Sequence, residues 1–208
     1  MAMTTVQRQR DVQRGIRLEY LTVGWNVLEG AIAIVAGSIA GSVALVGFGL
    51  DSAIESSSGA VLLWRLHAER NGENIERLEK TALKLVGIGF LLLAAYVAFD
   101  SISTLLLREA SRRSVVGIAL SLASLLVMPL LARAKRRTAS DLNSAALHAD
   151  SRQTSICAYL SAILLGGLLL NAVAGWWWAD PVAALVMVPI IAQEGREALK
   201  GDTCADCH

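Results

Sequence analysis

Two acidic residues, Asp51 and Glu55, lie four positions apart inside an apolar stretch that begins near Val43 and ends near Arg65. On a helix, this spacing places both carboxyl groups on the same face, where they repel each other when both are ionised. We expect no basic partner, because no Lys or Arg falls in the middle of any apolar run. The pair must then keep at least one proton or bind a cation. A site that exchanges protons for a divalent metal ion satisfies both conditions.

A second polar pattern follows in the segment from His148 to Cys157. Asp150, Gln153, Thr154 and Cys157 are spaced at i, i+3, i+4 and i+7, which makes one polar stripe on a helix. A helix that starts near His148 places Cys157 about 14 Å from its inner end, close to the expected depth of the two carboxylates. Carboxylate, thiolate and amide groups at one depth predict a four-ligand site for Zn²⁺, and the thiolate also admits softer ions.

Several of these residues could instead have a structural role that involves no metal. Cys157 alone would also suit a small buried apolar position, and Gln153 and Thr154 could simply bond between helices. Asp150 is expected at the cytoplasmic mouth, where it either admits the metal or is solvated. Asn26 and Glu29 share a helix face at i, i+3, and they would either support the metal ligands and a proton path or pack between helices.

The chain ends in Cys204-Ala-Asp-Cys207-His208. A Cys-x-x-Cys-His pattern can signal covalent haem attachment, but that chemistry belongs on the outer side of a membrane. We expect this tail inside, in a reducing compartment where a disulfide is disfavoured. Two thiols and an imidazole could capture or sense a metal. A tail without a function fits the sequence equally well.

The elements that must position these residues are long apolar runs. Of the 208 residues, 54% are apolar and 18% are charged, whereas a soluble domain is about one quarter charged. Runs of about 20 apolar residues predict membrane-spanning helices. We expect an all-α membrane protein with one transport domain over residues 18–198, an N-terminal segment over 1–17 and a short tail over 199–208. The six expected spans are Leu18–Gly37, Val43–Trp64, Ala82–Leu107, Val115–Leu131, His148–Gly175 and Pro181–Ala198.

The distribution of basic residues predicts the orientation. All but three of the 19 Lys and Arg residues lie on the side of the two termini, and the exceptions are Arg108, Arg112 and Arg113. Because basic loops stay inside, we expect both termini in the cytoplasm and a multi-pass location in the cell membrane, which is the inner membrane in a bacterium. The balanced net charge of +1 gives no indication of nucleic-acid binding. Trp176, Trp177 and Trp178 suit the outer interface, and Asp180 before Pro181 suits an N-cap.

Three segments together resemble the cation diffusion facilitator family. Gly41–Glu55 is similar to that family's second helix, Ala149-Asp150 to the start of its fifth, and Trp178–Leu185 to the opening of its sixth. The resemblance implies a homodimer that exports Zn²⁺ or a similar ion against protons, with the metal between helices 2 and 5 and the helix-2 ligands at Asp51 and Glu55. It also implies a short branch without the family's cytoplasmic C-terminal domain.

The fifth helix departs from the family pattern. Where the family usually places His and Asp, this chain has Gln153 and Cys157. Zn²⁺ is therefore the first expectation, with Cd²⁺, Co²⁺, Mn²⁺ and Fe²⁺ as alternatives. A membrane protein that binds metal and regulates a partner without transporting is the alternative function. We expect no enzymatic activity, because no His lies in mid-membrane to act as a base, although a metal and paired carboxylates could activate water.

Overall fold

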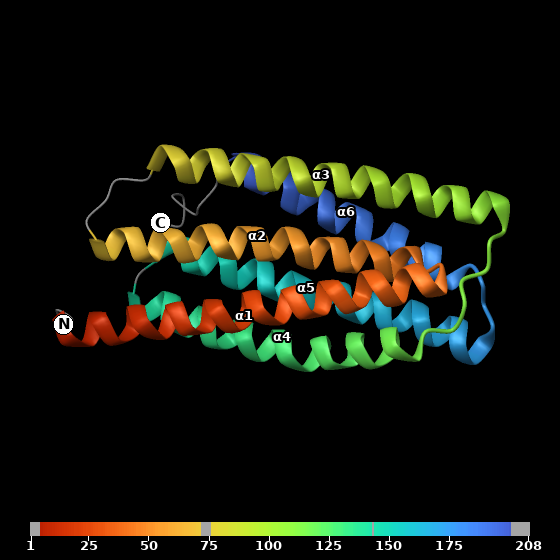
Figure 1. The fold of residues 1–208 in the computed structure, drawn as a ribbon, viewed down its shortest axis with the longest axis horizontal. Helices are drawn as coiled ribbons and strands as arrows, with labels where there is room; N and C mark the ends of the chain where they lie inside the picture. Colours follow the sequence, from red (N-terminus) through yellow and green to blue (C-terminus); the bar gives the residue numbers. More distant parts are fainter. Residues whose placement is uncertain (1–4, 72–75, 143, 201–208) are drawn as a thin grey trace.

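The structure is a computed structural model that describes residues 5–71, 76–142 and 144–200. Within these ranges every regular element is helical, and six long helices lie side by side in an up-and-down bundle (Figure 1). A short π-helical turn, η1, continues α5. The bounds are α1 Thr5–Ala40, α2 Val43–Asn71, α3 Glu76–Leu107, α4 Val115–Leu142, α5 Ala145–Leu169, η1 Leu170–Ala174 and α6 Ala179–Lys200.

Four helical segments are long and apolar enough to cross a membrane: Gln9–Ala40, Lys84–Leu107, Val115–Leu142 and Asp150–Ala174. Polar and charged residues lower the mean hydropathy of α2 and α6, which are outside this group. The prediction of an all-helical membrane protein is confirmed. That all six helices cross the membrane, and that both termini are cytoplasmic, stays a prediction.

The distribution of side chains also suits a lipid environment. Large apolar side chains cover the outside, such as Leu92, Phe99 and Leu106 of α3, which are 67%, 73% and 79% exposed. Several charged side chains lie inside, where Glu19 and Lys135 are fully buried. A polar residue within a membrane bundle normally faces the bundle interior, and this arrangement follows that rule.

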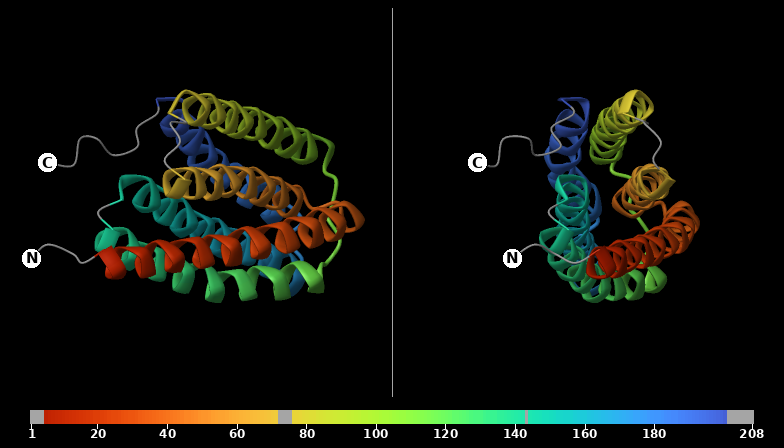
Figure 2. Two further views of the ribbon diagram at one scale, coloured as in Figure 1. Left: turned by 60° about the vertical axis from the view of Figure 1, so that its left-hand side comes forward. Right: turned by 90° about the vertical axis from the view of Figure 1, so that its left-hand side faces the viewer.

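The helices pack in two groups. The most extensive contacts are those of α1 with α2, α4 with α5, and α3 with α6. Contacts between α1 and α4 join the first two pairs into a four-helix group. The end-on view of Figure 2 shows α3 and α6 together at one side of this group. They contact it through α2 and α5.

Glycines allow the closest backbone approaches in both groups. A Cβ atom on Gly87 of α3 would lie 2.8 Å from the carbonyl oxygen of Gly195 of α6. Between α1 and α2, a Cβ on Gly49 would lie 2.9 Å from the backbone nitrogen of Ile34, and one on Gly37 would lie 2.9 Å from that of Val46. Because such distances exclude any side chain, these helices pack backbone against backbone, as membrane helices with small residues do.

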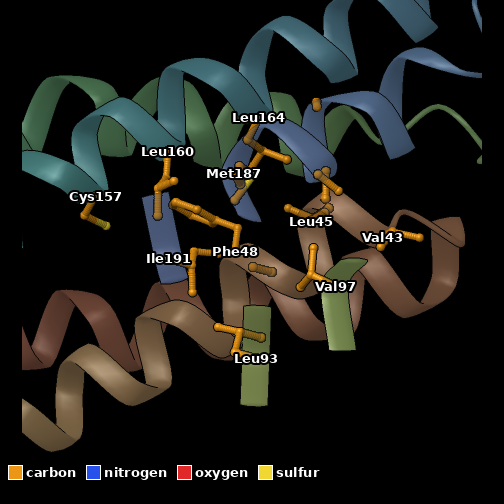
Figure 3. Close-up of a cluster of buried hydrophobic side chains, with 14 of the residues drawn as sticks. Val43, Leu45, Phe48, Leu93, Val97, Cys157, Leu160, Leu164, Met187 and Ile191 are labelled. Carbon is orange, nitrogen blue, oxygen red and sulfur yellow. The ribbon is translucent and has the colours of Figure 1, made fainter. Parts of the chain in front are cut away.

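The apolar core lies where α2, α3, α5 and α6 meet (Figure 3). Each of these helices contributes buried side chains to it. Cys157 of α5 lies at one end of the cluster and is 1% exposed. The other labelled members are Val43, Leu45 and Phe48 of α2, Leu93 and Val97 of α3, Leu160 and Leu164 of α5, and Met187 and Ile191 of α6.

Candidate functional site

A small cavity beside this core is lined by the four residues that the sequence predicts as metal ligands. It has a volume of about 10 Å³, which is room for about one water molecule or one bare ion. Its lining comes from α2, α3, α5 and α6, and it is the meeting point of the two helix groups. The lining residues are Asp51, Glu55, Phe90, Gln153, Ile156, Cys157 and Glu194.

Asp51 and Glu55 occupy the inner face of α2. Each is 5% exposed, and among the described residues neither forms an ion pair with Lys or Arg. The side-chain amide of Asn26 on α1 donates a hydrogen bond of 3.0 Å to Oε2 of Glu55. The other oxygen of Glu55 is buried without a hydrogen-bond partner. Lys135 of α4 interacts with Glu55 electrostatically without forming an ion pair with it, so one Glu55 oxygen remains free to accept a bond.

Gln153 and Cys157 reach the cavity from α5. Oε1 of Gln153 accepts a hydrogen bond of 3.4 Å from the hydroxyl of Ser58 on α2. Cys157 is a free, buried thiol beside the Glu55 carboxylate. The four residues expected to bind metal thus share one cavity. However, within the described ranges no three His, Cys, Asp or Glu side chains converge closely enough to hold a metal ion. Binding a metal here requires these donors to move closer together.

Asp150 and Thr154, on the same stripe of α5, belong to a different cluster. Nζ of Lys135 on α4 lies 2.5 Å from Oδ2 of Asp150 and 3.4 Å from Oγ1 of Thr154. It also lies 2.8 Å from Oε2 of Glu19 on α1. The side chain of Lys135 is fully buried and that of Asp150 is 11% exposed. Asp150 is thus a member of a buried ion-pair cluster that joins α1, α4 and α5.

The burial of Lys135 was not predicted from the sequence, which has no Lys or Arg in the middle of an apolar run. The apolar run ends at Leu131, so the basic residues after it suggest a loop, but α4 continues to Leu142. Lys135 is stable inside the bundle because two carboxylates offset its charge. One of them, Glu19, belongs to a helix distant in sequence, and linear hydropathy contains no information about that partner.

Asn26 and Glu29, the two polar residues predicted to share a face of α1, differ in their contacts. Asn26 contacts Glu55, as described above. Glu29 is 1% exposed, and neither of its carboxylate oxygens has a hydrogen-bond partner. Ser52 of α2 and Ser124 of α4 are its neighbours. Only Asn26 therefore touches a residue of the cavity directly.

The chain matches one protein-family model. The model described as the cation efflux transmembrane domain matches residues 21–202, which includes all six helices in part or whole. The chain belongs to the cation efflux family. This membership confirms the resemblance noted from the segments around Asp51, Asp150 and Asp180.

A curated relative is similar over much of the chain. The uncharacterized transporter sll1263 of Synechocystis sp. is 27% identical over 171 residues, which are 79% of this chain and 55% of the relative. The chain therefore spans about half the length of the curated relative that it matches.

Sequence reasoning missed Glu194, the cavity's contribution from α6. The last expected span, Pro181–Ala198, includes Glu194, but its apolar pattern ends at Ala192, and Glu194 was not considered as a ligand. Its position could have been found from the helical period of α6. Met187 and Ile191 are fully buried, and Glu194 lies seven residues after the first and three after the second, which places it on the same helix face. It therefore continues the inward face of α6 in this cation efflux protein.

Asp180 has a role other than the expected N-cap. The helix α6 begins at Ala179, and the Asp180 side chain accepts a hydrogen bond of 2.5 Å from the hydroxyl of Ser42. It also faces the backbone N–H groups of Val43 and Ala44 at the start of α2. Asp180 thus caps a neighbouring helix of the bundle. The tail residues Cys204, Cys207 and His208 lie outside the described residues.

Proposed function

We propose that this protein exports a divalent cation, with Zn²⁺ first, in exchange for protons by alternating access. Membership of the cation efflux family supports the general class. The observation that supports the site is the pair Asp51 and Glu55, buried on one face of α2 without a basic partner and lining a cavity with Gln153 and Cys157. Two carboxylates, a thiolate and an amide oxygen form a donor set that suits Zn²⁺ and admits Cd²⁺.

The proposed cycle follows from the chemistry of these donors. A metal ion from the cytoplasm displaces protons from Asp51, Glu55 and Cys157, because carboxylate and thiolate ligands bind metal in their deprotonated forms. The ion must shed most of its water, since the cavity has room for only about one water-sized particle. Protons from the outer side then return to the same groups and release the metal.

The position of the cavity between two helix groups suits alternating access. The α2 and α5 ligands belong to the four-helix group, while Phe90 and Glu194 belong to the α3–α6 pair. A rocking motion of one group against the other would open the cavity to one side at a time. We further propose a homodimer in the cell membrane with both termini in the cytoplasm.

The test is metal flux into proteoliposomes that contain the purified protein and a trapped metal-sensitive dye. Asp51→Asn and Glu55→Gln should each abolish flux, whereas Asp100→Asn on α3, away from the cavity, should leave it intact. Flux should increase with a proton gradient directed against the metal. Transport by Asp51→Asn at the unmutated rate would overturn the proposal. Metal binding without flux in the unmutated protein would instead indicate a non-transporting regulator.

A further inference from the structure

We propose that Glu194 of α6 is a third carboxylate of the transport site, so that the bound metal ion links α2, α5 and α6. This inference rests on the proposed function and specifies its ligand set. Glu194 lines the same cavity as Asp51, Glu55 and Cys157. It lies close enough to interact electrostatically with both α2 carboxylates.

The neighbours of Glu194 leave its carboxylate available for a metal. Arg152 of α5 is close to it, but its guanidinium forms an ion pair of 3.3 Å with Glu197, one turn further along α6. Gln193 also donates a hydrogen bond of 3.0 Å to Glu197. Arg152 and Gln193 therefore both contact Glu197 rather than Glu194. Among the described residues, no ion pair involves Glu194.

A divalent cation would resolve the charge imbalance of the cavity. Three carboxylates face it, and one buried oxygen of Glu55 has no hydrogen-bond partner. Like charges this close, in a buried setting, are costly unless protons or a cation neutralise them. On α5 the neutral Gln153 and the thiol of Cys157 provide no carboxylate. Glu194 therefore supplies from α6 the carboxylate that α5 does not.

The backbone around Glu194 determines which helix group it follows. The next residue, Gly195, packs against Gly87 of α3, where a Cβ would lie 2.9 Å from the Gly87 carbonyl oxygen. Glu194 is thus fixed to the α3–α6 pair, while Asp51, Glu55 and Cys157 are fixed to the four-helix group. A metal held by both sets pulls the two groups together. This requirement fits the present geometry, in which the donors share a cavity but do not converge.

The experiment compares Glu194→Gln with Asp100→Asn, a matched loss of one carboxylate on α3, away from the cavity. Zn²⁺ dissociation constants are measured by calorimetry on the full chain in detergent. We expect Glu194→Gln to weaken Zn²⁺ binding by about tenfold or more, and Asp100→Asn to change it by less than about twofold. Glu194→Asp, which keeps the charge, should retain intermediate affinity. Circular dichroism checks that Glu194→Gln folds. If it does not, Glu194→Asp is the variant whose Zn²⁺ affinity tests the proposal.

A double-mutant cycle then separates ligation from a general effect of charge. If Asp51 and Glu194 hold the same ion, the losses in Asp51→Asn and Glu194→Gln will not add in the double variant. Unmutated Zn²⁺ affinity in Glu194→Gln, or additive losses, would overturn the role of Glu194. That outcome would leave the proposed function intact, because the function is tested separately, by flux of the unmutated protein and its loss in Asp51→Asn and Glu55→Gln.

Discussion

The ammonium group of Lys135 lies 2.8 Å from the carboxylate of Glu19, and both side chains are almost completely buried. With Asp150, the pair joins three helices through charges that lipid would not tolerate alone. This cluster lies next to the cavity along α5, where Asp150 precedes Gln153 by less than one turn. It differs from the cavity because its carboxylates already have a cation, although Lys135 and Asp150 are close enough to Glu55 to interact with it electrostatically.

Removing the lysine should destabilise the bundle. In Lys135→Ala, Glu19 and Asp150 become buried charges without a partner, which costs about 3–5 kcal/mol in comparable cases. The free energy of unfolding in mixed micelles measures this loss. Arg136→Ala is the matched control, because Arg136 is exposed on the next position of α4 and its one hydrogen bond, to Ser155, is at the surface. Equal stability of the two variants would contradict a structural role for Lys135.

The affinity for metal should fall as the solution becomes more acidic. The ligands bind metal only after losing their protons, so protons compete with Zn²⁺, and the dissociation constant should rise about tenfold per pH unit for each proton displaced. Calorimetry between about pH 6 and about pH 8 measures the slope. Asp51→Asn removes one exchangeable group and should flatten it, whereas Asp100→Asn should not. A dissociation constant independent of pH would exclude proton exchange at this site.

The thiol of Cys157 should set the preference for soft ions. Replacing it with a hydroxyl in Cys157→Ser should weaken Cd²⁺ binding relative to Mn²⁺ by about tenfold or more, because thiolate favours soft metals and hydroxyl oxygen does not. Competition between the two ions in the flux assay measures the ratio. Ser161→Ala, one turn along the same helix, is the control. If the Cd²⁺ to Mn²⁺ ratio is unchanged in Cys157→Ser, the thiol is not a ligand.

The glycine contact between α3 and α6 should tolerate no added atoms. In Gly87→Ala the new methyl group meets the Gly195 carbonyl oxygen and the Leu199 backbone at 2.8 and 2.9 Å. Overpacking of this kind costs about 1–3 kcal/mol. Gly166→Ala on α5 provides the opposite case, since no atom lies within 4 Å of its added Cβ. It should be neutral or stabilising by up to about 1 kcal/mol. Thermal unfolding in detergent compares them, and a Gly87→Ala protein as stable as Gly166→Ala would refute the close contact.

The sequence predicted the helices well where a polar turn bounded an apolar run. The starts at Val43 and Val115 and the end at Leu107 agree with α2, α4 and α3. These limits are local, because glycine or basic residues terminate the hydrophobic pattern there. The agreement is poorer at the N-terminal end of α1 and the C-terminal end of α4, where both extend as charged helices beyond their apolar parts. Hydropathy shows where lipid contact stops, and a helix can continue past that point.

Site residues could be predicted from the sequence only where a polar or acidic pattern interrupts an apolar run. Asp51 and Glu55 stand out because two acids interrupt an apolar run. Lys135 and Glu194 each follow an apolar run, and such residues normally suggest a solvated end. The contacts that place them inside the bundle come from helices far away in sequence. Glu19 of α1 pairs with Lys135, and α2, α3 and α5 form the rest of the cavity that the half-buried Glu194 lines. Tertiary pairing of this kind is absent from a linear pattern.

The turn of Gly41 and Ser42 between α1 and α2 has a mechanical consequence. Gly41 adopts a left-handed conformation with φ of 64°, and the two helices meet backbone to backbone along Gly37 and Gly49. Because the turn is short and the two helices are in close backbone contact, α1 and the first part of α2 should move as one rigid unit. A tilt of α1 near Glu19 should therefore also move the part of α2 that carries Asp51, so that a change far from the cavity alters its lining.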